Sequence, residues 1–322
     1  MTRLPAFELS RPRSLDEALS ALSCEGARAI AGGSDVLPAL KLGRGRPREL
    51  VSLAAVRELA GITLEAGALR IGAATRLDEL SRHELVRAYA PALAEAAGHV
   101  GSPQLRRMGT LGGNICLDTR CRYVDQSPLF RQALGGCLKA DGTACHVVPG
   151  GTRCVAALSA DTVPALCVHE ATVELASLAG RRELPIDALY GTDGARHLRL
   201  ERGELVLSVR VRRHAEARFA YRKWAVRRAI DFPLVSVGVR LELRGGALAG
   251  GLVAAGVLGP APRRVPLDAL CGRALDGRLA EDVASLAFER CRPLPNVPYD
   301  ETYRRLRLRI EVRRAVLALS GE

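Results

Sequence analysis

The chain has 322 residues, a formal net charge of +12, 48% hydrophobic residues and nine cysteines. This length predicts two or three domains, and the ordinary balance of apolar and charged residues excludes an intrinsically disordered chain. The longest uncharged run, residues 245–262, contains six glycines and two prolines, so no membrane span is expected. The amino terminus lacks the apolar segment of a secretory signal. We therefore expect a cytoplasmic protein whose thiols stay reduced.

The positive charge is almost entirely arginine. Of the 47 basic residues only Lys41, Lys139 and Lys223 are lysines, and the 44 arginines are spread along the chain. Nucleic-acid binding is not expected, because aromatic residues make up only 4% and no basic stripe is interleaved with them. An acidic partner surface or an anionic ligand accounts for the excess charge equally well.

The first hundred residues predict helices and strands in alternation. Ser14 and Glu17 form a capping-box pattern that opens a helix over 15–23. Further strands are expected at 27–31, 49–53 and 69–71, and further helical stretches at 35–42, 76–81 and 91–100.

The second half predicts a separate unit of strands and helices. Alternation over 163–178 is typical of strand. More strands are expected at 206–211, 235–243 and 252–258, and helices at 280–287 and 303–319. The charged stretch between Arg212 and Phe219 is the expected boundary, which divides the chain into domains 1–212 and 213–322.

Five of the nine cysteines lie within 39 residues, at positions 116, 121, 137, 145 and 154. A reduced compartment favours metal ligation over disulfides. No CxxC pair is present, and four thiolates from a wide loop suit an iron–sulfur cluster. A zinc site and unligated thiols remain open alternatives, and His146 is a possible competing ligand.

Two glycine pairs, in AIAGGSD (29–35) and GTLGGN (109–114), could hold a pyrophosphate between two loops. Each pair alone is equally explained by a tight turn. No GxGxxG or GxxxxGK[ST] pattern occurs, so neither a Rossmann site nor a P-loop is supported. Lys223 hints at a required ammonium group, although an exposed position is the simpler interpretation, and Asp161 fits a turn or a helix cap.

Four segments in this order, AGGSDVLPALKLG, IGAATRLDEL, GTLGGN and LSADTVPAL, resemble the FAD-binding subunit of the molybdenum hydroxylase (xanthine dehydrogenase) family. YRKWAVRRAIDFPLVSVGV resembles the carboxy-terminal flavoprotein domain of that family. The resemblance implies an α+β fold. It places a two-subdomain FAD-binding domain of the molybdopterin dehydrogenase/vanillyl-alcohol oxidase type first, followed by a C-terminal α+β domain like the CO dehydrogenase flavoprotein.

Residues 116–155 are an insertion relative to most members of this family. A cysteine-bearing insertion here resembles the branch of 4-hydroxybenzoyl-CoA reductase beta subunits, which hold a [4Fe-4S] cluster beside the FAD. The resemblance implies that Cys121, Cys137, Cys145 and Cys154 are the cluster ligands, and that Cys116 belongs to the flavin loop.

The resemblance also implies which residues bind FAD, while it implies no catalytic residue in this chain. The implied cofactor-binding residues are Ala29, Ile30, Ala31, Gly32, Gly33, Ser34, Asp35, Val36, Val100, Thr110, Leu111, Gly112, Gly113, Asn114, Tyr123, Asp161, Val206 and Lys223.

The function implied is electron transfer from reduced ferredoxin, through the cluster and FAD, to a small [2Fe-2S] subunit and a large molybdopterin subunit. There, 4-hydroxybenzoyl-CoA would lose its hydroxyl group. One alternative is a hydroxylase subunit that passes electrons from an aromatic or heterocyclic substrate to NAD or another acceptor. A second alternative is a binding module with a structural zinc site.

Overall fold

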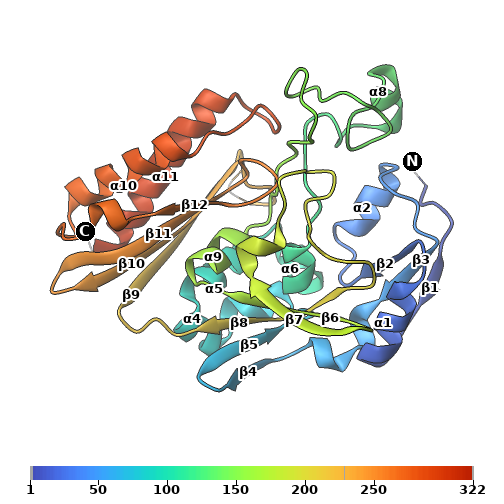
Figure 1. Cartoon of the computed structure of the whole chain (residues 1–322), viewed down its shortest axis with the longest axis horizontal. Helices are drawn as coiled ribbons and strands as arrows, with labels where there is room; N and C mark the ends of the chain where they lie inside the picture. The colour runs from blue at the N-terminus through green and yellow to red at the C-terminus, as the bar shows by residue number, and fades with distance from the viewer. Residues whose placement is uncertain (1–2, 228, 321–322) are drawn as a thin grey trace.

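The computed structural model describes residues 3–227 and 229–320 and contains three β-sheets (Figure 1). The first sheet is parallel, with the order β1-β3-β2, and consists of β1 (Glu8–Ser10), β2 (Ala27–Ile30) and β3 (Glu49–Ser52). Helix α1 (Leu15–Ser23) buries Leu15, Ala18, Leu19 and Leu22. It starts where the capping box predicts, because Ser14 Oγ accepts a hydrogen bond from the Glu17 N–H at 3.2 Å.

The second sheet is antiparallel and has the order β4-β5-β8-β6-β7. Its strands are β4 (Ile62–Glu65), β5 (Ala68–Gly72), β6 (Thr172–Ser177), β7 (Gly180–Pro185) and β8 (Leu205–Arg212). Helices α3 (Leu77–Arg82), α4 (Glu84–Tyr89), α5 (Pro91–Gly98), α7 (Leu111–Ile115) and α9 (Thr162–Val168) share the largest hydrophobic core with it. The short helix α6 (Pro103–Met108) lies outside this core.

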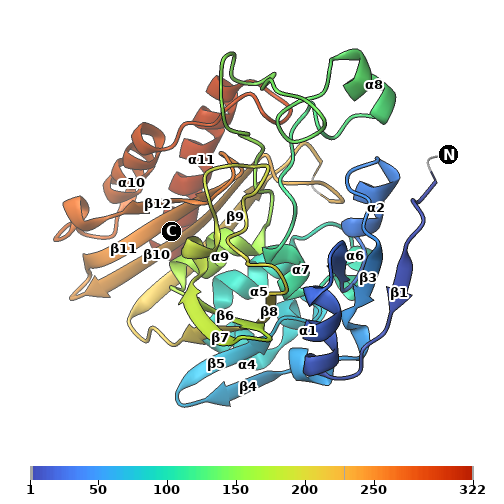
Figure 2. The ribbon, with the colours of Figure 1, turned by 45° about the vertical axis from the view of Figure 1, so that its right-hand side comes forward.

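The third sheet is antiparallel, with the order β12-β11-β10-β9, and is covered on both faces. It consists of β9 (Ala217–Trp224), β10 (Val235–Arg244), β11 (Ala247–Gly256) and β12 (Arg263–Pro266). Helices α10 (Gly277–Arg290) and α11 (Glu301–Ser320) pack on one face, as Figures 1 and 2 show. Tyr221, Leu252 and Ala254 on the other face join the core of the second sheet, so the two sheets form one continuous body.

The cysteine-bearing insertion extends away from the sheets as a loop around helix α8 (Pro128–Ala133), close to α2 (Val36–Lys41) (Figures 1 and 2). The buried Arg131 anchors it, since its guanidinium donates to the carbonyl oxygens of Leu42 at 2.7 Å and Gln126 at 2.6 Å. Four short 3-10 helices complete the fold: Leu53–Ala55, Arg57–Leu59, Ile186–Leu189 and Asp268–Leu270.

The prediction of strand over 163–178 is wrong for its first part. Residues 162–168 form α9, and only Thr172–Ser177 is strand. Every residue of α9 is buried, so the helix has no polar face and its sequence carries no helical periodicity. Strand β9 was not expected, and neither were β1, β4, β7, β12 and α8.

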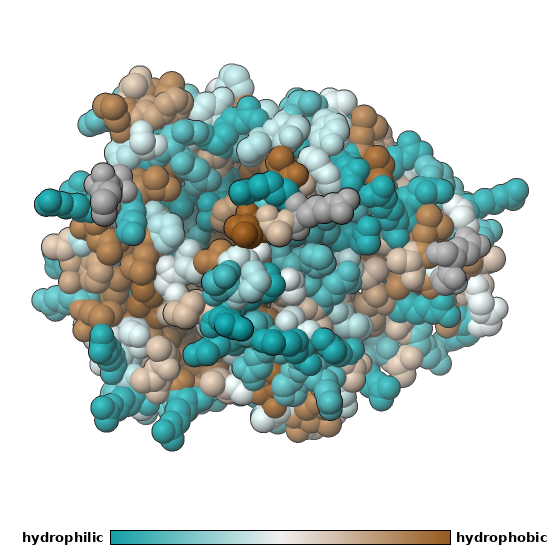
Figure 3. Space-filling model, turned by 180° about the vertical axis from the view of Figure 1, so that it is seen from behind, coloured by the Kyte–Doolittle hydropathy of each residue, from teal (hydrophilic) through white to brown (hydrophobic). Residues whose placement is uncertain are grey.

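The surface seen from behind is mostly hydrophilic (Figure 3). Apolar surface appears on the lobe at the upper left of this view, where α8 exposes Leu129, Phe130 and nearby Leu134. Within residues 3–227 and 229–320, none of the helices combines the length and the apolar character needed to cross a bilayer.

Candidate functional site: an elongated cavity beside a four-cysteine pocket

A cavity of about 800 Å³ lies where the first two sheets meet the loop after β9. It is lined by the segment from β2 into α2, by the start of α7, by parts of residues 198–206 and by residues 230–232. This volume lies toward the upper end of the range for cofactor sites, which are about 300 to 1,000 Å³. Most of the cavity wall is apolar, with polar backbone at the two glycine segments.

The first glycine segment, residues 29–36, supplies hydrogen-bond donors to this cavity. Gly33 has a positive φ of 70°, which turns the chain from β2 into α2. Within the described parts of the chain, the N–H groups of Gly32, Gly33, Ser34 and Asp35 make no hydrogen bond to protein. Successive free amides at a turn of this kind form an anion-binding concavity, so the segment fits the pyrophosphate of a dinucleotide.

In the second glycine segment, the N–H groups of the two paired glycines are bonded within the protein, so this pair shapes the cavity without offering hydrogen-bond donors to it. The Gly112 N–H is bonded to the Ala73 carbonyl at 2.8 Å, and the Gly113 N–H is bonded to Thr110 Oγ1 at 3.1 Å. The bond to Thr110 caps the first turn of α7, and the bond to Ala73 holds this turn against the segment after β5. A Cβ atom on Gly112 would lie 2.8 Å from the Ala73 Cβ, so glycine is required by close packing.

The two glycine segments meet through Gly32. A Cβ atom at this position would lie 1.9 Å from the Met108 carbonyl oxygen, directly before Gly109. A side chain is therefore excluded where the two segments approach each other. The sequence expectation of two juxtaposed glycine loops matches this geometry.

Asp161 lies in the wall of the cavity, where it is 3% exposed, and it is held by two partners from β9. Its carboxylate accepts hydrogen bonds from the Tyr221 hydroxyl at 2.7 Å and from Lys223 Nζ at 3.1 Å. Burial raises the pKa of Asp161, and the positive charge of Lys223 acts against this shift. Lys223 also donates to the carbonyl oxygens of His99 and Asp231, both at 2.9 Å.

Fourteen of the eighteen implied cofactor-binding residues line the cavity: Ala29, Ala31, Gly32, Gly33, Ser34, Asp35, Val36, Val100, Thr110, Gly112, Gly113, Asn114, Asp161 and Val206. Four do not. Ile30 is half-buried outside the lining, Leu111 is in the hydrophobic core, and Tyr123 lines the cysteine pocket instead. Lys223 is not part of the lining, but its ammonium group donates to Asp161, which is.

Sequence reasoning missed several parts of the cavity wall, among them residues within 22–28, within 198–205, and 230–232. These segments carry no distinctive motif. Gly26 and Gly203, with φ values of +81° and +78°, are turn signals in two of them.

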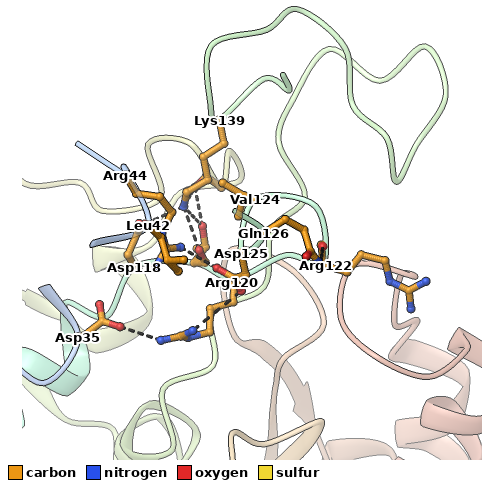
Figure 4. Close-up of polar contacts among 12 residues, drawn as sticks. Asp35, Leu42, Arg44, Asp118, Arg120, Arg122, Val124, Asp125, Gln126 and Lys139 are labelled. Atoms are coloured by element: carbon orange, nitrogen blue, oxygen red, sulfur yellow. Dashed lines mark hydrogen bonds and ion pairs between the residues drawn. The ribbon is translucent and has the colours of Figure 1, made fainter. Parts of the chain in front are cut away.

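Arg120 was also missed, and it closes one side of the cavity. Its guanidinium donates to Asp35 Oδ1 at 2.8 Å and lies over the Phe232 ring, 3.7 Å from the ring centre. Figure 4 shows the contact with Asp35. Arg120 thus joins the first glycine segment to the loop after β9, and it directly precedes Cys121.

A second, much smaller pocket of about 20 Å³ is lined by all four predicted ligands, Cys121, Cys137, Cys145 and Cys154. Cys121 and Cys154 are buried, and the other two are half-buried. The glycines around Cys137 allow this convergence: Gly136 has a φ of +75°, and a Cβ on Gly142 would lie 2.6 Å from the Cys137 nitrogen. Residues spread over 34 positions of the sequence thus face one space.

Backbone amides point at two of these sulfur atoms. The Val148 N–H donates to Cys145 Sγ at 3.4 Å, and the Ala156 N–H donates to Cys154 Sγ at 3.5 Å. Burial nevertheless raises the pKa of Cys121 to about 11 and raises that of Cys154. Metal ligation would displace the thiol protons, and the charge of the metal would itself stabilise the thiolates.

The pocket does not have the geometry of a site for a single ion. Across residues 3–227 and 229–320, no three His, Cys, Asp or Glu side chains lie close enough together to hold one metal ion. His146 Nε2 is within 2.6 Å of the Gly136 carbonyl oxygen, so this ring nitrogen is already engaged. The alternative of a structural zinc site therefore finds no support in the geometry.

Comparison with known proteins identifies the family of the chain. Residues 5–212 match the family described as "FAD binding domain in molybdopterin dehydrogenase". The chain is 28% identical over 320 residues to the carbon monoxide dehydrogenase medium chain of Hydrogenophaga pseudoflava, covering 98% of this chain and 97% of that one. It is 32% identical over 272 residues to an aldehyde oxidoreductase FAD-binding subunit of Escherichia coli, covering 81% and 84%.

Solved structures agree over the whole length. The carbon monoxide dehydrogenase from Hydrogenophaga pseudoflava superposes with a TM-score of 0.79 at 27% identity, covering 98% of both chains. Quinoline 2-oxidoreductase from Pseudomonas putida superposes with a TM-score of 0.78 at 25% identity, covering 98% of this chain and 97% of that one. The free amides at 32–35 and the elongated cavity fit FAD. The chain belongs to the FAD-binding subunits of the molybdenum hydroxylase family.

Proposed function

We propose that this chain is the FAD- and [4Fe-4S]-containing electron-transfer subunit of a molybdenum-dependent aromatic acyl-CoA reductase. In this role it receives electrons from a reduced ferredoxin and delivers them toward a molybdenum subunit, for the reductive dehydroxylation of 4-hydroxybenzoyl-CoA. The partners proposed are a large molybdopterin subunit and a small [2Fe-2S] subunit. Their presence is consistent with the relatives, which are described as medium chains or FAD-binding subunits.

One observation carries this proposal. Cys121, Cys137, Cys145 and Cys154 face one pocket, and the adjacent residue Arg120 lines the FAD cavity. Four cysteines that line one pocket supply the number and kind of ligands that a [4Fe-4S] cluster takes. Amide N–H groups directed at two of the sulfurs support the same donor set.

The two groups would supply complementary electron chemistry. FAD exchanges one or two electrons and a [4Fe-4S] cluster exchanges single electrons, so the pair suits a one-electron donor and a two-electron reduction. The chain's own residues bind and separate the two groups: residues 29–36 face the pyrophosphate, and residues 116–121 connect the two pockets. No side chain of this subunit needs to act on the acyl-CoA.

The cluster is tested by iron and sulfide analysis of protein purified without oxygen together with its co-encoded subunits. We expect about four irons per chain in the wild type beyond those of the small subunit. C137A and C145A are expected to lose this iron and keep FAD, whereas C271A, which alters an exposed cysteine far from the pocket, keeps both. Zinc in place of iron, or full iron in C137A and C145A, would refute the cluster.

The reaction is tested with the assembled complex. We expect reduced ferredoxin to support conversion of 4-hydroxybenzoyl-CoA to benzoyl-CoA. The second candidate is a hydroxylase that passes electrons from an aromatic or heterocyclic substrate to NAD or another acceptor. The similarity to a quinoline 2-oxidoreductase favours it. Substrate-dependent reduction of NAD or an artificial acceptor, with no thioester reduction, would establish the second candidate instead.

A further inference from the structure

We propose that Lys139 is a buried charge that raises the reduction potential of the cluster and fixes the segment joining the cluster to the flavin cavity. This proposal rests on the proposed function, because it requires a cluster between the four cysteines. Lys139 is one of three lysines in a chain with 44 arginines. Among the described residues that line the cysteine pocket, it is the one lysine or arginine.

The ammonium group is held by a tight set of oxygen atoms. Its side chain is 8% exposed, and Nζ donates to Asp118 Oδ1 at 2.7 Å, the Gly194 carbonyl at 2.9 Å and the Thr119 carbonyl at 3.1 Å. The Thr119 hydroxyl is a further contact. Figure 4 shows Lys139 reaching down from the insertion toward Asp118. These acceptors surround a point charge, and a planar guanidinium would not fill the same position.

The location of these partners gives Lys139 its positioning role. Leu117 and Arg120 line the FAD cavity and Cys121 lines the cysteine pocket, so residues 117–121 are a segment that borders both sites. Lys139 binds Asp118 and Thr119 within this segment, and it ties them to Gly194 from a distant loop. The contact therefore holds in place the segment that borders both pockets.

The charge of Lys139 acts on the pocket as well. The ammonium donates to the Gly194 carbonyl at 2.9 Å, and the N–H of the same glycine donates to the Cys154 carbonyl at 2.7 Å, so the charge lies next to the backbone of this cysteine. A cluster with four thiolate ligands is a net anion that becomes more negative on reduction, so a buried cation nearby stabilises the reduced form more than the oxidised form. The carboxylate of Asp118 offsets part of this charge. Solvent screens the carboxylate more than the ammonium, because the side chain of Asp118 is 28% exposed and that of Lys139 is 8% exposed. The net effect favours reduction.

The test measures the midpoint potential of the cluster by EPR-monitored titration of the anaerobic complex, with iron content measured in parallel. K139M is expected to lower the midpoint by about 59 mV, which corresponds to a tenfold change in the ratio of reduced to oxidised cluster for one electron. D118N is expected to shift the midpoint in the opposite direction. K139R keeps the charge, so its midpoint stays near the wild-type value although its iron content falls.

The matched control is K41M, which removes the same charge from an exposed position on α2 and leaves the midpoint unchanged. A purely structural role would lower the iron content of K139M and D118N without opposite shifts. An unshifted midpoint in K139M that retains iron overturns the proposal for Lys139 alone. A wild-type complex without this iron overturns the proposed cluster, and the role of Lys139 with it.

Discussion

The guanidinium of Arg120 lies 3.7 Å from the ring centre of Phe232, and the same group donates to Asp35 at 2.8 Å. All three residues line the cavity in which we propose that FAD binds, and they come from the insertion, the loop after β9 and the first glycine segment. A cation over an aromatic face contributes about 0.5 to 2 kcal/mol. One side chain therefore joins three segments around the cofactor.

R120Q is expected to weaken FAD binding about tenfold, because the cavity loses both the ion pair and the cation–π contact. The measurement is flavin fluorescence titration of the flavin-free protein. R153Q, which alters an exposed arginine of the same insertion, serves as the control and should bind FAD as the wild type does. Equal affinities of R120Q and the wild type would contradict this role of Arg120.

G32A is expected to abolish or weaken FAD binding by at least tenfold. The added methyl group would lie 1.9 Å from the Met108 carbonyl oxygen, so the two glycine segments must separate. The matched variant is G277A, because a Cβ there meets no atom within 4 Å. G277A should keep both FAD affinity and thermal stability, whereas a G32A protein with wild-type flavin content would disprove the close approach.

The Asp161–Lys223 pair is expected to show a coupling of about 1 to 3 kcal/mol in a double-mutant cycle. D161N leaves the Lys223 ammonium without its counter-ion, and K223M leaves a buried carboxylate with only the Tyr221 hydroxyl. The double variant D161N/K223M removes both charges and should therefore be more stable than K223M. Thermal unfolding of the four flavin-free proteins measures the cycle, and additive effects would rule out the coupling.

Acid should destabilise the protein through His169. Burial lowers the pKa of His169 to about 3, and neither ring nitrogen has a hydrogen-bond partner among the described residues. The unfolded chain binds the proton with a pKa near 6.5, so stability is complete above pH 6.5 and falls as the pH drops toward 3. At pH 5 the loss from this residue is about 2 kcal/mol.

H169F keeps a ring against Phe219, which His169 stacks on at 3.9 Å, and it removes the titration. Its unfolding midpoint should therefore fall less between pH 8 and pH 5 than that of the wild type. Urea unfolding at both pH values provides the comparison. An identical loss in the two proteins would show that other groups cause the acid sensitivity.

Much of the fold was predictable because local signals agree with tertiary packing. The capping box at Ser14 places α1, and the glycine pairs mark both sides of the FAD cavity. The helical state of 162–168 was not predictable, because a helix buried on all sides has no periodic pattern. The wall formed by 198–205 and the contact between Arg120 and Phe232 depend on segments that only the folded chain brings together.

The role of Lys223 shows a similar limit. The sequence marked this lysine as unusual, and the resemblance placed it at the flavin, yet the structure puts it behind Asp161. Its hydrogen bonds to His99 and Asp231 carbonyls come from two loops that no motif connects. The sequence identified Lys223 as unusual, but its hydrogen-bond partners became known only from the folded chain.

The cysteine-bearing insertion is held by hydrogen bonds to the segment between α10 and α11. The Arg122 N–H bonds to the Asn296 carbonyl at 2.7 Å, its guanidinium donates to the Val297 carbonyl at 2.7 Å, and Asn296 Nδ2 donates to the Val155 carbonyl at 2.7 Å. During synthesis, the loop leaves the ribosome long before residue 296 does. These contacts can therefore form only after the strands of the third sheet have been synthesised, so the surroundings of this pocket are completed later than the pocket's own segment.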